Sequence, residues 1–147
     1  TPVVSSAASD VYKRQQPILI GDGDVSGGLK AAEGLVDLLY GIGAAPEGVI
    51  TATAVKAMGG FFEGRLHFMD DSFKERALKM LGSDINNLWS ADDLCRSSDS
   101  FFIASGVCSG WIPGVKFDGN KAEVTSKIIF GDSSETQIII NEYILGE

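Results

Sequence analysis

The chain has 147 residues, of which 44% are hydrophobic and 22% charged, so its size and composition are those of one ordinary globular domain. Its 20 acidic and 12 basic residues give a formal net charge of −8, which argues against nucleic acid and anionic membranes as partners. No apolar run reaches the roughly 18 residues that a transmembrane helix needs. We therefore expect a soluble protein of the cytoplasm, or of the plastid if the source is a photosynthetic eukaryote.

The first sixteen residues, TPVVSSAASDVYKRQQ, are small, polar and aperiodic. They show neither the apolar alternation of a strand nor the apolar spacing of a helix. We set residues 1–16 apart as a non-native or disordered leader and expect residues 17–147 to form one α/β domain.

Two units of strand, turn and helix are predicted next. The apolar run Ile18 to Ile20 predicts a short buried strand, and a helix follows over Val25 to Ala32. Leu38 to Tyr40 predicts a second buried strand, and Pro46 opens a helix that ends at a pair of glycines after Met58.

The pattern changes in the second half of the chain. A strand over Gly64 to Phe68 and helices over Ser72 to Leu81 and Ser90 to Leu94 continue the alternation of strands and helices. Four strands joined by short turns are then predicted over Ser100 to Ser105, Trp111 to Phe117, Ala122 to Phe130 and Thr136 to Tyr143. These elements predict a three-layer α/β sandwich whose mixed sheet begins with parallel βα units and ends with antiparallel strands.

The segment Gly21 to Gly27, GDGDVSG, lies between a predicted strand and a predicted helix, where α/β folds place their ligands. Its glycine spacing resembles a dinucleotide loop, but Asp22 and Asp24 would place carboxylates beside the phosphates. The two aspartates suit sugar hydroxyls or a metal ion better. They would equally well cap the following helix, and the segment alone does not separate these interpretations.

A second loop, Gly41 to Gly48, repeats this arrangement after the next predicted strand. Glu47 falls in the first turn of a helix, where a carboxylate is stabilised by the helix dipole. It is either a cap of that helix or a metal ligand. Two such loops at neighbouring strand ends predict one shared pocket.

The two loops carry a family resemblance. In order and spacing, Ile20 to Val25, Leu39 to Val49 and Gly64 to Leu66 resemble class II fructose-1,6-bisphosphatases, and GIGAAPEG at residues 41–48 is the most specific string. Weaker similarity continues through Asp92 to Leu94, Ala104 to Gly106 and Gly114 to Phe117. The resemblance covers nearly all of the chain after residue 16 and corresponds to the C-terminal portion of that family.

The resemblance implies a metal-dependent phosphatase that removes the 1-phosphate of fructose 1,6-bisphosphate, with Mn²⁺ or Mg²⁺ as cofactor and a role in gluconeogenesis or the Calvin cycle. It implies that Glu47 binds the metal and that Asp22, Gly23 and Asp24 contact the sugar. Ala44 would line the substrate pocket, and alanine there resembles the branch that also accepts sedoheptulose 1,7-bisphosphate. The resemblance further implies a homo-oligomer.

The family's other metal carboxylates, including an Asp-Pro-x-Glu-Gly-Thr type of motif, have no match in this sequence. Phosphoryl transfer needs several carboxylates around the metal ions, so we expect the chain to be inactive by itself. An alternative function is a non-catalytic module that binds a dinucleotide or a sugar phosphate. In that alternative the Gly21 to Gly27 loop holds the ligand, Glu47 is only a cap, and binding is indifferent to divalent metal.

Several other polar residues suit structural roles better. His67 is the sole histidine and has no partner residue in sequence, so we interpret it as structural. Arg65 could reach a phosphate, although an arginine at a strand end is more often a surface ion-pair member. Asp92 and Asp93 follow Ser90 at a predicted helix start, where the helix dipole accounts for both.

Overall fold

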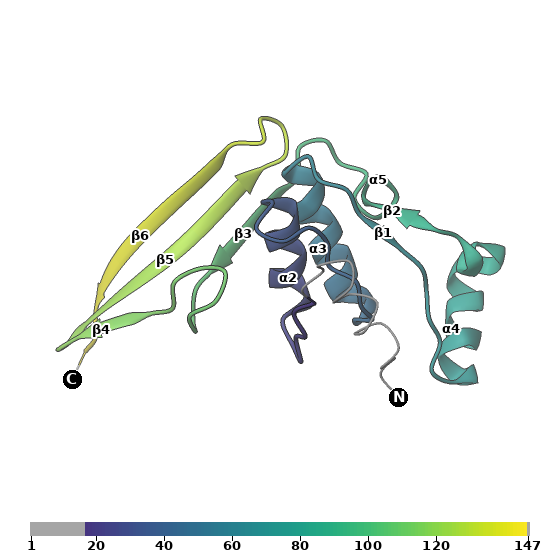
Figure 1. The fold of residues 1–147 in the computed structure, drawn as a ribbon, viewed down its shortest axis with the longest axis horizontal. Helices are drawn as coiled ribbons and strands as arrows, with labels where there is room; N and C mark the ends of the chain where they lie inside the picture. Colours follow the sequence, from purple (N-terminus) through teal and green to yellow (C-terminus); the bar gives the residue numbers. More distant parts are fainter. Residues whose placement is uncertain (1–16, 147) are drawn as a thin grey trace.

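The structure, a computed structural model, describes residues 17–146. The leader predicted over residues 1–16 lies outside this range. Within it, helices lie against one side of an antiparallel sheet, and a smaller helical region extends from their far side (Figure 1). Among the described residues no helix combines the length and apolar character that crossing a membrane requires.

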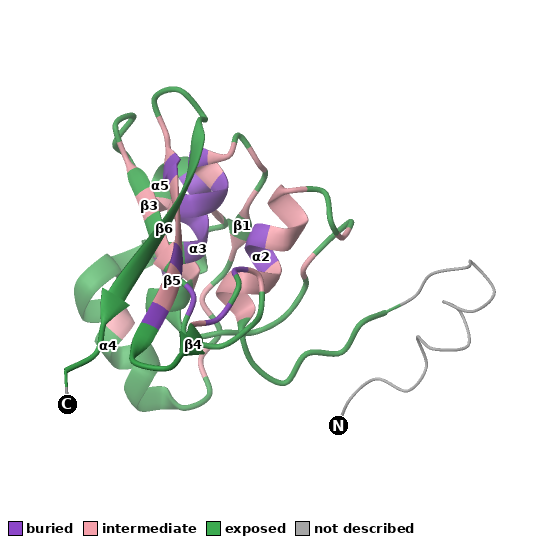
Figure 2. Ribbon diagram, turned by 90° about the vertical axis from the view of Figure 1, so that its left-hand side faces the viewer, coloured by how far each residue is buried: buried purple, intermediate pink, exposed green. Residues whose placement is uncertain are grey.

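Helices α2 (Asp24–Ala32) and α3 (Ala45–Ala57) form the centre of the molecule and confirm the first two predicted helices. They approach each other closely at Gly28, where an added Cβ would lie 2.5 Å from Cγ2 of Thr51. Leu29 of α2 and Val55 of α3 are buried, and Figure 2 shows buried stretches in both helices. Small residues on the facing surfaces therefore let the two helices pack tightly.

The strands predicted over residues 18–20 and 38–40 are not found, because both segments run as irregular chain. Leu19 and Tyr40 are 95% and 94% exposed, which is the reverse of the predicted burial. A strand persists only where a neighbouring strand takes up its backbone hydrogen bonds, and no described strand pairs with either segment. Ile20 and Leu39 alone turn inward, and their side chains meet at Gly27 of α2.

The smaller region follows α3. Strand β1 (Glu63–Gly64) pairs antiparallel with β2 (Trp89–Ser90), so the strand predicted over residues 64–68 is reduced to two residues and starts earlier. The predicted helix at residues 72–81 is confirmed as α4 (Asp71–Leu81), followed by the 3₁₀ turn η1 (Gly82–Asn86). The short helix predicted at residues 90–94 is α5 (Ala91–Leu94).

The main sheet is antiparallel, as predicted for the C-terminal strands. It consists of β3 (Phe101–Ser105), β4 (Lys116–Asp118), β5 (Lys121–Phe130) and β6 (Thr136–Ile144). Strand β5 is central, with β6 along one edge and β3 and β4 end to end along the other. The strand predicted over residues 111–117 forms only over β4.

Helices α2 and α3 lie on one side of this sheet (Figure 1), α3 contacts β3 and β5, and Ile129 of β5 is fully buried. The α/β class is therefore confirmed. The three-layer arrangement with parallel βα units is not found in residues 17–146, since the strands pair antiparallel and only one face of the sheet carries helices.

A cluster of polar side chains connects the end of α2 to the sheet. Glu33, the residue after α2, accepts hydrogen bonds from Nε1 of Trp111 at 2.6 Å and from Nζ of Lys127 on β5. That Nζ also lies 4.4 Å from the centre of the Trp111 ring, a cation–π distance. Partial burial acts to raise the pKa of Glu33, but the hydrogen bonds from Lys127 and Trp111 and the charge of Lys127 outweigh it and lower that pKa.

Candidate functional site

The candidate site lies at the N-termini of α2 and α3, where the two glycine-rich loops enter their helices. Gly23 is the N-cap residue of α2, with a left-handed φ of 85°. The Gly23 N–H donates to Oδ1 of Asp22 at 2.7 Å, and the Ser26 hydroxyl donates to the Gly23 carbonyl at 2.8 Å. Gly23 has no side chain with which to cap α2, and Asp24 lies in the first turn, where the helix dipole favours a carboxylate.

Gly43 is the point at which the two loops meet. A Cβ added there would lie 2.5 Å from Oδ2 of Asp24 and 3.7 Å from Oε2 of Glu47. The carboxylate of Asp24, from the first loop, therefore reaches over the second loop and occupies the space that a side chain at residue 43 would fill. The structure thus brings Asp24 and Glu47 together across Gly43.

Glu47 also has a local role. Its Oε2 accepts a hydrogen bond from the backbone N–H of Ala44 at 3.2 Å, and the helix dipole of α3 favours a carboxylate in this first turn. Ala44 is the N-cap residue and has extended backbone angles. One oxygen of Glu47 thus accepts the hydrogen bond that caps α3, and the other oxygen can still bind a ligand.

The carboxylates at the site do not form a complete metal centre by themselves. Residues 17–146 contain no group of three His, Cys, Asp or Glu side chains placed to hold a metal ion. Magnesium-like ions are commonly held by one or two protein carboxylates together with waters and substrate phosphates. Glu47 fits such a partial donor set, and the exposed positions of Asp22 and Glu47 leave the site open to further ligands.

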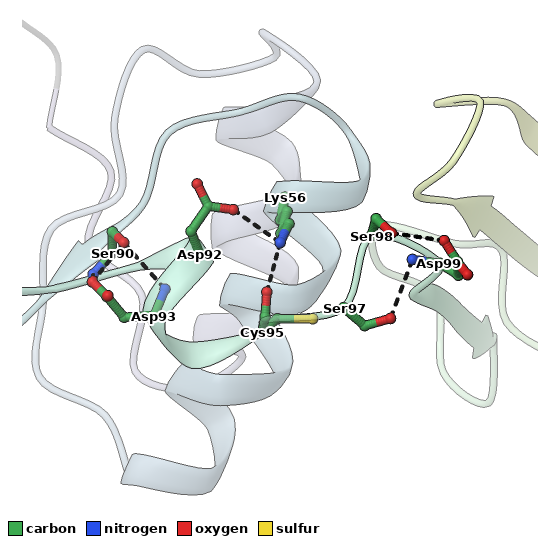
Figure 3. A network of polar contacts seen from close by, with 8 residues as sticks. All are labelled: Lys56, Ser90, Asp92, Asp93, Cys95, Ser97, Ser98 and Asp99. Carbon is green, nitrogen blue, oxygen red and sulfur yellow. Dashed lines mark hydrogen bonds and ion pairs between the residues drawn. The ribbon is translucent and has the colours of Figure 1, made fainter.

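The acids around α5 are structural. Oδ2 of Asp93 accepts hydrogen bonds from the backbone N–H of Ser90 at 2.9 Å and from its hydroxyl at 2.6 Å (Figure 3). These bonds, those of the Ser90 side chain first, lower the pKa of Asp93. Asp92 pairs with Nζ of Lys56 at 2.9 Å, and that nitrogen also donates to the carbonyl of Cys95 (Figure 3). The structural interpretation of Asp92 and Asp93 is therefore confirmed.

Arg65 and His67 lie apart from this site. Both line a polar cavity of about 710 Å³ beside the start of α4, together with Asp70 and Lys74. None of the predicted site residues lines that cavity.

Sequence reasoning missed the contact of Asp24 with Gly43. It also missed the tie between Glu33 and Lys127, which are 94 residues apart. For the Asp24 contact, the available signal in the sequence was the glycine at residue 43 within GIGAAPEG. A contact over so long a separation has no local signal.

Comparison with known proteins matches residues 14–143 to the family described as bacterial fructose-1,6-bisphosphatase, glpX-encoded. The chain is 34% identical over 146 residues to a D-fructose 1,6-bisphosphatase class 2/sedoheptulose 1,7-bisphosphatase of Trichodesmium erythraeum, covering 88% of this chain and 42% of the relative. Similarly named proteins of Acaryochloris marina and Gloeobacter violaceus are 36% and 33% identical, covering 82% and 86% of this chain and 39% and 41% of theirs. The chain thus spans about two fifths of the length of these relatives.

Proposed function

The chain belongs to the family of bacterial, glpX-encoded fructose-1,6-bisphosphatases, and we propose that it is part of a metal-dependent phosphatase that hydrolyses the 1-phosphate of fructose 1,6-bisphosphate. The observation that carries the proposal is the meeting of Asp24 and Glu47 across Gly43. Sedoheptulose 1,7-bisphosphate is proposed as a second substrate, because the relatives are named for both activities.

In this proposal Glu47 is a ligand of Mn²⁺ or Mg²⁺. Its place in the first turn of α3 fixes the carboxylate, since the Ala44 N–H holds one oxygen. A divalent ion bound there would polarise the phosphoryl group and lower the pKa of an attacking water. Glu47 cannot hold such an ion alone, so the remaining carboxylates come from the rest of a family-length polypeptide, and the 147-residue chain is inactive by itself.

Asp22 and Asp24 bind the sugar in this proposal. Carboxylate oxygens accept hydrogen bonds from hydroxyl groups and repel phosphates, so the two side chains would select the polyol part of the substrate. The turn at Gly23 orients Asp22, because the Gly23 N–H donates a hydrogen bond to the Asp22 carboxylate. Ala44 lines the substrate pocket beside these two aspartates. We place the enzyme in the cytoplasm and propose that it assembles as a homo-oligomer.

The test is phosphate release from fructose 1,6-bisphosphate with Mn²⁺ by a family-length polypeptide that contains this chain. Glu47→Gln is compared with Asp71→Asn, because Asp71 is likewise an acid in the first turn of a helix but belongs to α4. We expect the Glu47→Gln variant to lose at least about 100-fold in activity, as ligand loss removes the metal, and Asp71→Asn to keep it.

Equal activity in the two variants would mean that Glu47 only caps its helix and does not bind the metal. A wild-type protein without phosphatase activity, but with binding of a dinucleotide or sugar phosphate that is unchanged by EDTA, would support the binding-module alternative instead.

A further inference from the structure

The polar cavity beside the start of α4 has the size of a small-molecule site. Its volume is about 710 Å³, and roughly 300–1,000 Å³ is typical of ligand pockets in proteins. Three segments line it, namely the connection from β1 to α4, the first turn of α4 and the end of η1 (Figure 1). The buried side chain of Ile85 and the amide of Asn86 come from η1. The cavity therefore has room for a small metabolite and not only for a single ion.

Basic side chains reach this cavity from two of the three segments. Exposure alternates along the connection, where Arg65 and His67 are exposed and the residues between and after them are half-buried. This alternation points the two basic side chains to the same side of the chain. Lys74 lines the cavity from α4. A guanidinium holds phosphate oxygens through paired hydrogen bonds, an ammonium adds a point charge, and an imidazole has an N–H donor in either protonation state.

The two permanently charged cations of the cavity are not used in ion pairs. Within residues 17–146 the four ion pairs are made by other lysines, which are Lys56, Lys116, Lys121 and Lys127. The surface ion pair that the sequence suggested for Arg65 is thus not found in the described part of the chain. Arg65 and Lys74 are therefore available to an anion.

Two acids also line the cavity, and one of them is already engaged. Oδ1 of Asp70 accepts hydrogen bonds from the backbone N–H groups of Ser72 at 2.8 Å and Phe73 at 3.1 Å, and from the Ser72 hydroxyl at 2.6 Å. These donors and the helix dipole of α4 offset the charge of Asp70. Asp71 is the other acid. Two cations and an imidazole thus face one carboxylate that these contacts do not offset, in a chain whose net charge is −8.

We propose that this cavity binds a phosphate group, as the free ion or as part of a small metabolite, with Arg65 and Lys74 holding the phosphate oxygens. The guanidinium provides the directed hydrogen bonds, and the ammonium adds the second positive charge that a dianion requires. Asp22, Asp24, Ala44 and Glu47 do not line the cavity, so the inference does not depend on the proposed phosphatase activity.

Protection of Lys74 from acetylation tests the proposal. A family-length polypeptide that contains this chain is used, because it includes whatever else packs against the cavity. Acetylation by an N-hydroxysuccinimide ester is followed at each lysine by mass spectrometry, with inorganic phosphate or glucose 6-phosphate at about 0.1–30 mM, the range of weak binding. KCl at equal ionic strength controls for screening.

We expect both probes to slow acetylation of Lys74 at least about threefold, because a bound phosphate covers its amine. Lys79 is the internal control, since it also belongs to α4 but does not line the cavity, and its rate should not change. Half-protection at a lower concentration of glucose 6-phosphate than of phosphate identifies a metabolite as the ligand, and the reverse order identifies the free ion.

Arg65→Gln should abolish the protection of Lys74, whereas Arg76→Gln, on α4 but outside the cavity, should keep it. Circular dichroism checks that both variants keep the fold, which the exposure of both arginines favours. Equal slowing at Lys74 and Lys79, or protection that survives Arg65→Gln, would overturn the proposal. So would a Lys74 that is unreactive before any anion is added, since another part of the polypeptide would then fill the cavity.

Discussion

Replacing Gly28 by alanine tests the close contact on which the position of the site depends. The new methyl group would lie 2.5 Å from Cγ2 of Thr51, whereas carbon atoms prefer about 3.5–4.0 Å, so the two helices would have to separate. Thr51 cannot simply rotate away. Its χ1 is restricted by the branched Cβ, and its hydroxyl donates to the carbonyl of Glu47 at 2.8 Å.

Two effects of opposite sign determine how Gly28→Ala changes the free energy of unfolding. Overpacking of a tight contact costs about 1–3 kcal/mol, while alanine in place of glycine within a helix gains about 0.5–1 kcal/mol. We expect Gly28→Ala to lower the free energy of unfolding by about 0.5–2 kcal/mol, with a fall in Tm of a few degrees, measured by urea and thermal denaturation.

Gly48→Ala in α3 is the matched control. Nothing lies within 4 Å of a Cβ added there, so the helix propensity acts alone and the variant should be more stable than the wild type by about 0.5–1 kcal/mol. Thr51→Ser removes the colliding methyl group but keeps the hydroxyl, and it should therefore restore most of the loss when combined with Gly28→Ala. Stabilisation by Gly28→Ala as large as that by Gly48→Ala would refute the close approach of α2 and α3.

The pKa of Glu33 lies below its ordinary value of 4.5 in the folded chain, so its ionised form stabilises the fold above about pH 4.5 and this contribution disappears as the pH falls through the folded pKa. Urea denaturation from about pH 7 to about pH 3 should show the wild type losing more stability than Glu33→Gln in the acid range, and parallel curves would contradict this. Asp70 accepts hydrogen bonds from two backbone N–H groups in the first turn of α4, so Asp70→Ala should speed amide exchange there, while Asp71→Ala should change it much less. In a family-length protein, Gly43→Ala would collide with the carboxylate that lies there and should lower kcat/KM about tenfold or more, whereas Gly41→Ala, with nothing within 4 Å, should not.

Elements with strong local signals could be predicted from the sequence. The helix α3 begins with proline and ends at glycines, and α4 has an amphipathic sequence, so both were found near their observed bounds. The hairpin of β5 and β6 was likewise found from its apolar composition and the turn between its strands.

The runs at residues 18–20 and 38–40 show where local signals are insufficient. Their apolar composition is that of buried strands, yet a strand depends on a neighbour that supplies its hydrogen bonds, and no described strand does so. The same distinction applies to the site. Each loop was located by its glycines and acids, but the distance between Asp24 and Glu47 is set by how α2 packs on α3, which no local pattern reports.

In the proposed function, the two carboxylates that meet at Gly43 divide their roles between metal and sugar. The direct test is a Mn²⁺ titration of phosphate release from fructose 1,6-bisphosphate, using a family-length protein that contains this chain. We expect Glu47→Gln to raise the Mn²⁺ concentration for half-maximal activity at least about tenfold, and Asp24→Asn to keep the Mn²⁺ requirement and raise KM. An unchanged Mn²⁺ requirement in Glu47→Gln would contradict this division of roles.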